Sequence, residues 1–523
     1  MTGGPPHGSY LAGGGNPPAS SLGVVVTRRR TGDGRTPAPD APPAKLRELA
    51  FRGGSYLALR EGLGMLIRLV GVMVVTRTIG PRDFGLYVAA AAFAALVASV
   101  AQLGAEVYLI RQPEEPPLEQ YHEVFSALVV VSVAVTALSF AFSWPAELLL
   151  GPNGAVSAFR ILVLAVPVNI LWAPAQARIE RHFQYRRMAL IEVAGDAALY
   201  GTAVPLALLG FGVMAPVFGY LAWQCTLFAG SAIAARLLPR WRWSARTSRE
   251  LLRHGISYSS SNWLERVNSL ANPVIVGAFL GATGVGLVAL AIRLVDTAGF
   301  ALRAAWRLGL ATISRLVDQP QRLRPALEEG MLAQAIVLGV PLAGLAVVSP
   351  WLIPLVWGRT WEATASVYGI LAFTRLVSSV SLPQMTLLFA EGRNTKVAAA
   401  VAVRTAVMLL ASATLVPLLG LDGFAVAAVA ASSAWLMLDH AVRPRIGFSY
   451  RRCAPVIAGL GIPMFAPLIA WPWRMATCLP AVALIASADV RRSSIGFAGT
   501  ALRGVLGRSA RSDPAGPSSM SGS

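Results

Sequence analysis

Charged residues are scarce in this chain, and their scarcity excludes an ordinary soluble domain. Asp, Glu, Lys and Arg make up 14% of the 523 residues, whereas about 25% is typical of soluble globular proteins. Hydrophobic residues make up 55%, and the mean hydropathy is +0.58. The composition therefore predicts an integral membrane protein that crosses the bilayer many times.

Cysteine and histidine are also rare, and their spacing predicts no metal site. Cys225, Cys453 and Cys478 show no CxxC spacing, so neither a disulfide framework nor a zinc site is expected. The five histidines are scattered over helix ends and tails. The sequence also lacks GxSxG, HExxH, Walker A and dinucleotide-binding motifs. We therefore expect a protein that is not an enzyme and needs no cofactor or metal.

Lysine is nearly missing, so arginine supplies almost all of the positive charge. The formal net charge is +19, and Lys45 and Lys396 are the only lysines. The arginines are dispersed between apolar runs and are not gathered on one polar domain. A nucleic-acid partner would require a basic patch or stripe, so we do not expect one.

Long apolar runs are abundant, and residues 56–109 show how they are organised. Two such runs flank a six-residue turn at 80–85, and about 20 apolar residues suffice to cross the hydrocarbon core. This stretch predicts a helical hairpin. We predict fourteen spans, near 57–79, 86–109, 123–144, 157–176, 189–209, 214–235, 256–280, 286–309, 331–350, 364–390, 397–417, 423–441, 454–471 and 475–488.

The spans divide into two groups of six, followed by two more. Polar, Gly- and Pro-rich ends predict disordered tails, because they cannot bury enough apolar surface to fold. The predicted fold is all-α, with two six-helix lobes and two C-terminal helices. Its parts are a cytoplasmic tail at 1–45, an N-lobe at 46–236, a cytoplasmic linker at 237–255, a C-lobe at 256–442, helices thirteen and fourteen at 443–490 and a second cytoplasmic tail at 491–523.

The distribution of arginine between loops predicts the orientation. Counted along the fourteen spans, alternate loops hold most of the arginines, and the other loops hold only Arg82, Arg359 and Arg474. Cytoplasmic loops are enriched in Lys and Arg. Both termini are therefore predicted to be cytoplasmic, although the loop at 111–123 is mostly acidic.

Internal repeats relate the two groups of spans. A shift of 201 residues aligns the glycine pairs Gly80 with Gly281 and Gly85 with Gly286. A shift of 209 aligns Pro174 with Pro383, and one of 210 aligns 208–210 with 418–420. An even number of spans per unit keeps both repeats in one orientation. We therefore expect a pseudo-symmetry axis along the membrane normal, as in transporters built from parallel repeats.

Charged and polar groups inside the predicted spans are the candidate functional residues. Each charge costs about 2.5–3.5 kcal/mol at the centre of a membrane helix, so such residues are expected to line a cavity or pair. The seventh span carries a polar stripe at helical spacing that ends in a break at Asn272–Pro273. Its positions are 258, 261, 262, 265, 268, 269 and 272.

Several of these residues have a purely structural alternative. Arg293 and Asp296 are three residues apart and could neutralise each other. Arg404 lies near enough to a membrane face to snorkel. Arg68 and Arg375 lie deepest and have no carboxylate three or four residues away. Because guanidinium groups suit phosphates through bidentate hydrogen bonds, these arginines predict an anionic substrate such as a pyrophosphate headgroup.

A resemblance is carried by residues 76–87, which read TRTIGPRDFGLY. This run resembles the first-turn signature of bacterial polysaccharide, or O-antigen, flippases, A-R-x-L-G-P-x-x-F/Y-G-x-Y. Leu103-Gly104 and the later Leu109-Ile110-Arg111 are similar to the end of helix two in that family. In layout the resemblance extends from about residue 50 to 490. It implies the multidrug/oligosaccharidyl-lipid/polysaccharide exporter superfamily, with two six-helix lobes in a V and alternating access.

Two other branches of that superfamily fit this sequence less well. Lipid II flippases usually show D-A-F-x-x-A after the first turn, where this chain has Asp83-Phe84-Gly85. Multidrug antiporters carry an aspartate in helix one, where this chain has Glu61 and Arg68. By analogy with lipid II flippases, the two extra helices could form a groove for a lipid tail.

We therefore predict a flippase for an undecaprenyl-diphosphate-linked oligosaccharide in the bacterial inner membrane, serving lipopolysaccharide or exopolysaccharide biosynthesis. Other polysaccharide-assembly proteins are possible partners. A cation-coupled multidrug exporter, a lipid II flippase, a non-transporting envelope-assembly scaffold and a membrane-embedded glycosyl ligase or polymerase remain alternatives. The predicted residues are Arg68, Arg375 and Arg293 for the pyrophosphate, Asn262, Glu265 and Asn268 for the sugar path, and Glu61 or Glu265 for a coupling proton.

Overall fold

The computed structural model describes residues 43–481, except 113, 142, 144–154, 183, 239 and 299–318. The chain forms two compact units, residues 1–50 and 51–523, and the first contributes only the beginning of one helix to the described part. Apart from the bounds of that helix, everything that follows concerns the second unit. Within the described residues it consists of helices and turns, with no strand. The all-α class predicted from the sequence is thus confirmed.

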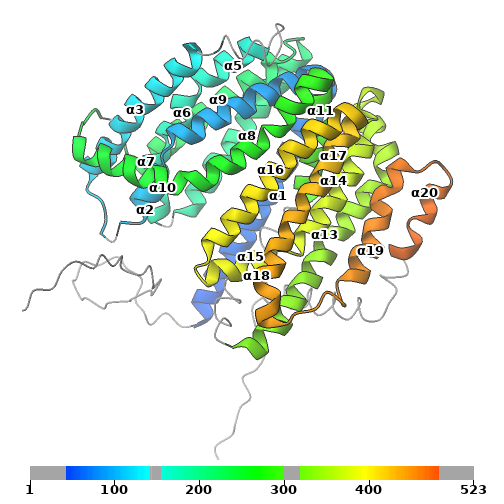
Figure 1. Ribbon diagram of the computed structural model, residues 1–523. Coiled ribbons are helices and arrows are strands. Elements are labelled where there is room, and N and C mark those ends of the chain that lie inside the picture. Colours follow the sequence, from blue (N-terminus) through cyan, green and yellow to red (C-terminus); the bar gives the residue numbers. More distant parts are fainter. Residues whose placement is uncertain are drawn as a thin grey trace, which may run out of the picture. The chain divides into compact units, whose positions relative to one another are not determined.

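The first helices run from residue 43 to residue 235, and in Figure 1 they are drawn from blue to green. The α8 and α9 helices pack against each other along their lengths, and the short helices α6 and α7 pack on α9. The bounds are α1 Pro43–Ala101, α2 Ala105–Ile110, α3 Leu118–Ala141, α5 Ala155–Leu164, α6 Val166–Leu171, α7 Ala173–Arg181, α8 Tyr185–Leu208 and α9 Met214–Ala235.

The later helices run from residue 245 to residue 476. Among them, α14 packs between α13, α11 and α17, while α16 lies beside α17 (Figure 1). The bounds are α10 Ala245–Ser269, η1 Asn272–Val276, α11 Gly277–Ala298, α13 Pro320–Trp357, η2 Arg359–Trp361, α14 Thr364–Ser379, α15 Leu382–Ala390, α16 Asn394–Leu419, α17 Leu421–Ser432, η3 Ser433–Trp435, α18 Leu436–Ile446, α19 Ala454–Gly461, η4 Ile462–Leu468 and α20 Trp473–Ala476.

Ten stretches of the described residues are long and apolar enough to cross a membrane. Two of them, Leu66–Ile110 and Arg266–Thr297, each overlap two of the predicted spans, joined through a kinked glycine. The predicted span at 454–471 appears as a shorter apolar segment, Ala454–Leu468, and most of 475–488 lies outside the described residues. The chain is therefore a multi-pass membrane protein, while the number fourteen remains a prediction.

The predicted repeat is visible in the backbone. Gly80 and Gly281 have φ values of 78° and 67°, and each interrupts a continuous run of helix. Gly210 and Gly420 also have positive φ, at 84° and 63°. Only glycine adopts such angles without steric strain. Pro174 and Pro383 likewise occupy the same place, at the start of α7 and of α15. The aligned glycines thus share a positive φ, and the aligned prolines share a position at a helix start, in both halves.

The two repeats cross where the aligned glycines meet. A Cβ atom on Gly85 would overlap the carbonyl oxygen of Ala282, and one on Gly286 would overlap that of Pro81. Under the 201-residue shift Pro81 corresponds to Ala282 and Gly85 to Gly286, so the contact is reciprocal. Backbones can approach this closely only where side chains are missing. Both glycines are therefore required by the same crossing.

We call the end of the bundle that contains residues 80–85 and 281–286 the glycine end. Contacts there join the two repeats, because the Phe84 ring packs edge to face against Trp361 with ring centroids 5.9 Å apart. Arg77 also donates through Nη1 to the carbonyl of Val356 over 2.9 Å, and Trp357 Nε1 donates to Thr76 Oγ1 over 2.9 Å. The glycine end is thus closed by packing and by hydrogen bonds.

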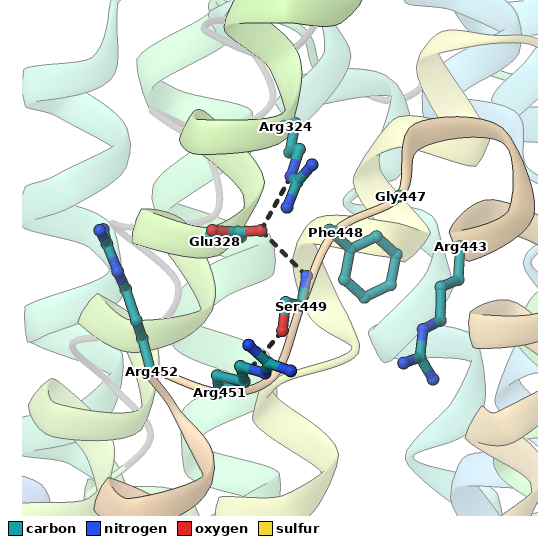
Figure 2. A pocket seen from close by; sticks show the side chains of 8 residues that line it. All are labelled: Arg324, Glu328, Arg443, Gly447, Phe448, Ser449, Arg451 and Arg452. Atoms are coloured by element: carbon teal, nitrogen blue, oxygen red, sulfur yellow. Dashed lines mark hydrogen bonds and ion pairs between the residues drawn. The ribbon is translucent and has the colours of Figure 1, made fainter.

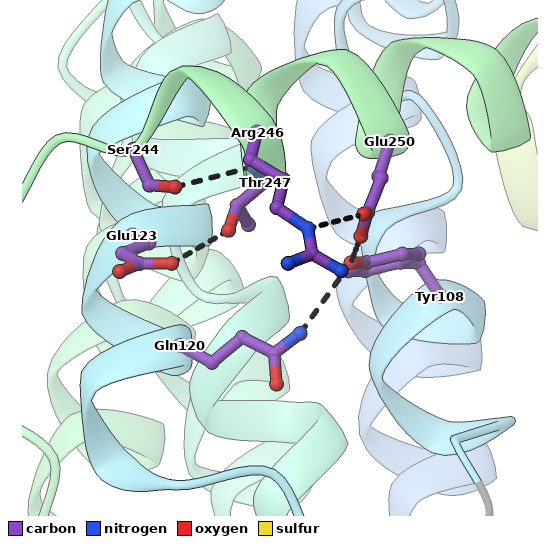
Figure 3. A network of polar contacts seen from close by, with 7 residues as sticks. All are labelled: Tyr108, Gln120, Glu123, Ser244, Arg246, Thr247 and Glu250. Carbon is purple, nitrogen blue, oxygen red and sulfur yellow. Dashed lines mark hydrogen bonds and ion pairs between the residues drawn. The ribbon is translucent and has the colours of Figure 1, made fainter.

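At the other end, the first turns of α10 bind the N-terminal helices (Figure 3). Thr247 donates to Glu123 on α3 over 2.6 Å, and Tyr108 on α2 donates to Glu250 over 3.1 Å. Ser244 caps the helix by accepting from the Thr247 backbone N–H over 3.3 Å. The helix begins at Ala245, so much of the segment predicted as a linker, 237–255, is an extension of the seventh span.

Candidate functional site

A cavity of about 750 Å³ lies between the second half of α1 and helices α10, α11, α14, α16 and α17. Apolar side chains form much of its wall, among them Phe84, Tyr87, Met408 and Phe424. All of the residues that line it lie within candidate membrane spans. The cavity therefore lies at a depth where a charged side chain is costly unless water, a partner or a ligand solvates it.

The charged lining of this cavity is strongly cationic. Among its described lining residues, Asp296 is the single carboxylate and there are four arginines, namely Arg266, Arg293, Arg375 and Arg404. These arginines come from α10, α11, α14 and α16. Four cations against one anion in a space of low dielectric produce a potential that favours an anionic ligand.

The charged side chains of the cavity contact their neighbours over long distances and stay partly exposed. Arg375 Nη2 lies 4.0 Å from Asp296 Oδ1, at the outer limit of an ion pair, and these side chains remain 46% and 59% exposed. Arg293 Nη2 donates to the Tyr200 hydroxyl over 3.3 Å. Arg404 lies over the Trp435 ring at 5.7 Å. The guanidinium groups of Arg293 and Arg375 thus remain accessible from the cavity.

A polar strip on α10 and η1 forms another part of the wall. Asn268, Ser269 and Asn272 all line the cavity. The Oδ1 atoms of Asn268 and Asn272 are buried, and neither has a hydrogen-bond partner within the described part of the chain. Such carbonyl oxygens can accept hydrogen bonds from hydroxyl groups of a ligand.

The helix break expected at Asn272–Pro273 is confirmed and shapes this strip. The α-helix ends at Ser269, and a π-helical turn runs over Asn272–Val276. The Asn272 side chain donates through Nδ2 to the Val285 carbonyl over 3.3 Å. Because π-helical turns are often found at functional sites, the local geometry agrees with a binding surface here.

Arg68 does not line this cavity. Its Nη1 atom lies 2.6 Å from Asp196 Oδ2 on α8, and the Asp196 side chain is only 10% exposed. One turn further along α8, Tyr200 accepts the hydrogen bond from Arg293. Arg68 thus pairs with α8, the helix that carries Tyr200. Sequence spacing could not show this carboxylate partner, since it lies on a distant helix.

Removing the carboxylate of this pair is expected to destabilise the protein. We predict that Asp196→Asn lowers the free energy of unfolding by about 1–2 kcal/mol, a value reduced for the 43% exposure of Arg68. The double variant Arg68→Gln/Asp196→Asn should be more stable than Asp196→Asn alone, because both charges of this pair are then removed together. Thermal unfolding of the purified chains checks both values, and a double variant that loses more than the single one contradicts the pairing.

The structure brings together three of the predicted site residues, Arg293, Arg375 and Asn268. The side chains of Glu61, Asn262 and Glu265 lie outside the described part of the structure. Sequence reasoning did not assign Arg266 and Arg404 to the site. Their signal was present, because both are charged residues within candidate spans, but only the packing shows which face they occupy.

Comparisons with known proteins place the chain in a family of polysaccharide biosynthesis proteins. A family model described as "Polysaccharide biosynthesis protein" matches residues 74–366. The succinoglycan biosynthesis transport protein ExoT of Rhizobium meliloti (strain 1021) is 23% identical over 324 residues, which are 62% of this chain and 65% of ExoT. The lipopolysaccharide biosynthesis protein WzxC of Escherichia coli (strain K12) is 25% identical over 354 residues, which are 66% and 71% of the two chains. The match thus spans a little under two thirds of ExoT.

The fold is shared with solved transporters. The lipid II flippase MurJ in its inward closed conformation gives a TM-score of 0.65 at 14% identity and covers 85% of this chain and 100% of MurJ. An inward-facing multidrug resistance MATE transporter of the MOP superfamily gives 0.61 at 14% identity and covers 75% and 98%. At this identity the likeness concerns the fold alone.

Proposed function

Because the chain belongs to the polysaccharide biosynthesis protein family, whose model covers more than half of it, we propose that it moves a lipid-linked oligosaccharide across the bacterial inner membrane. The observation that carries the proposal is the cavity with four arginines and one described carboxylate at membrane depth. A lipid-linked sugar must bring an anionic diphosphate through the apolar layer. A cationic cavity offsets the cost of removing that group from water.

The diphosphate is the group that the cavity suits best. Arg293 and Arg375 come from different helices and face the same space, so each could bind one phosphate through paired N–H donors. Asp296 holds Arg375 only at 4.0 Å, so a closer anion can replace it. In this proposal the carrier is undecaprenyl diphosphate, as the family resemblance implies.

Other residues would position the headgroup or contact the sugars. Tyr200 holds Arg293, and the pair of Arg68 with Asp196 supports the helix that carries Tyr200. Asn268 and Asn272 line the same cavity and would contact the glycan. We propose that Asn262 and Glu265 extend this polar path, and that Glu61 or Glu265 carries a coupling proton.

The reciprocal crossing of the repeats supports an alternating-access cycle. Closure at the glycine end rests on the backbone contacts of Gly85 and Gly286 and on hydrogen bonds between the repeats. Rocking one repeat against the other about the cavity would open this end and release the glycan. We further propose that the glycine end faces the periplasm, that both termini are cytoplasmic, and that other polysaccharide-assembly proteins supply and collect the glycan.

Deletion of the gene tests the proposed function. We expect surface polysaccharide to disappear and lipid-linked oligosaccharide to accumulate on the cytoplasmic side. The wild-type gene should return both quantities to their normal amounts. The measurements are surface glycan per cell and precursor per cell. Unchanged surface glycan together with increased drug sensitivity would indicate a multidrug exporter and overturn the proposal. Unchanged glycan and unchanged drug sensitivity would favour a scaffold and overturn it equally.

A further inference from the structure

A second arginine-rich pocket, separate from the cavity, lies where α13 begins and α18 ends (Figure 2). Its volume is about 550 Å³. The lining residues are Arg324, Glu328, Arg443, Gly447, Phe448, Ser449, Arg451 and Arg452. Four arginines thus surround one carboxylate, and nothing in the proposed transport path accounts for them.

The position of this pocket is set by the ends of membrane spans. One candidate span begins at Gln321, another ends at Ile446, and the apolar segment Ala454–Leu468 begins just after the pocket's last residue. A span ends where the hydrocarbon core gives way to the headgroup layer. The arginines of this pocket therefore lie at the ends of apolar helices, where long basic side chains of membrane proteins reach lipid phosphates.

The segment that carries the arginines is held rigidly. The Ser449 backbone N–H donates to Glu328 on α13 over 2.9 Å. Tyr450 donates to Asp439 over 2.7 Å and accepts from Gln384 over 2.6 Å. Phe448 is buried, at 2% exposure. Burial and the bond to Asp439 also raise the pKa of the Tyr450 hydroxyl, so it remains a donor. The segment is thus fixed to three helices.

The carboxylates near this segment already interact with an arginine, whereas Arg451 and Arg452 have no carboxylate partner among the described residues. Glu328 accepts from Arg324 over 3.2 Å, and Asp439 lies 3.9 Å from Arg443. The exposed side chains of Arg451 and Arg452 form no ion pair within the part of the chain that the structure describes. Figure 2 shows the four guanidinium groups spread around segment 447–452 instead of meeting at one point. Such spacing fits an anionic surface better than one enclosed ion.

We propose that this pocket binds the phosphate headgroup of an anionic membrane phospholipid. The acyl chains would pack against the neighbouring apolar helices α13, α18 and α19. Arg451 and Arg452, on the segment that these hydrogen bonds hold in place, would contact the phosphate. Basic pockets between membrane helices are known to bind anionic headgroups. This proposal does not depend on the transported substrate, because the pocket and the cavity share no lining residue.

Titration of the purified full-length chain in neutral detergent tests the proposal. Phosphatidylglycerol, phosphatidylcholine with the same acyl chains and inorganic phosphate are added separately, and the midpoint of thermal unfolding is followed. We expect phosphatidylglycerol to raise the midpoint at much lower concentration than phosphatidylcholine does. Arg451→Gln/Arg452→Gln should weaken the apparent affinity for phosphatidylglycerol roughly 25-fold, since each arginine near an anionic surface contributes about fivefold.

Matched variants separate this site from general charge attraction. Arg240→Gln/Arg249→Gln removes two exposed arginines elsewhere and should keep the preference for phosphatidylglycerol, as should Arg451→Lys/Arg452→Lys. An unchanged midpoint of Arg451→Gln/Arg452→Gln in phosphatidylcholine would show that this variant folds. The proposal is overturned if both glutamine variants lose affinity equally, if the wild type does not distinguish the two lipids, or if inorganic phosphate alone reproduces the effect.

Discussion

The double variant Arg293→Gln/Arg375→Gln is expected to abolish export of surface polysaccharide while the protein still reaches the membrane in normal amount. Both side chains line the cavity, and neither is deeply buried, so their neutral replacement should be tolerated by the fold. At an effective dielectric of 20, a charge 4 Å from a phosphate contributes about 4 kcal/mol. Each single variant should therefore lower export roughly 100-fold or more, and the double variant should show none.

The measurement is surface glycan per cell in a deletion strain that carries each variant, normalised to the amount of protein in the membrane. Arg375→Lys should recover part of the activity, because it keeps the charge but loses the paired donors. Arg240→Gln/Arg249→Gln is the control, since its exposed arginines lie outside the cavity. Near wild-type export by the double variant would exclude a headgroup role for these arginines.

Gly85→Ala is expected to reduce export at least fivefold, and Gly286→Ala should do the same. A methyl group at either position would collide with a backbone carbonyl of the other repeat, and backbone cannot move aside as a flexible side chain can. Closure of the glycine end would then be less favourable by roughly 1–3 kcal/mol. A shift of that size changes the population of the closed state about 5- to 150-fold.

Two other glycines of the spans are matched controls. Gly201 on α8 and Gly344 on α13 have open space where a Cβ atom would lie and ordinary helical φ. Alanine at either position should leave export unchanged and raise the unfolding midpoint slightly, because alanine favours the helix. The reciprocal crossing would be wrong as an account of closure if Gly85→Ala and Gly286→Ala matched these controls in export.

The backbone features of the repeat could be predicted from the sequence because they depend on single residue types. A sharp reversal of a helix needs positive φ, and glycine at positions 80 and 281 supplies it. Proline at positions 174 and 383 aligned in the repeat, but the sequence placed both inside continuous spans, and only the structure shows a helix starting at each. The resemblance drawn from the first turn is also confirmed by the family to which the chain belongs.

The side-chain partners could not be predicted, because they depend on how helices pack. Arg68 looked uncompensated from its neighbours in sequence, yet Asp196 lies 2.6 Å away on another helix. Asp296 lies three residues from Arg293 in sequence but pairs with Arg375. Snorkelling to a membrane face was one alternative for Arg404, and the structure adds that its side chain lines the cavity beside Trp435. Sequence periodicity identifies a polar face but not which helix it meets.

The most direct test of the central claim is the binding of the purified chain to polyprenyl lipids. The apparent affinity for undecaprenyl diphosphate is compared with that for uncharged undecaprenol, for the wild type and for Arg293→Gln/Arg375→Gln. We predict that the wild type prefers the diphosphate at least 100-fold, that salt weakens this preference, and that the double variant binds both lipids alike. A wild type that binds both lipids equally, or a double variant that keeps the preference, would contradict a cationic cavity for the diphosphate.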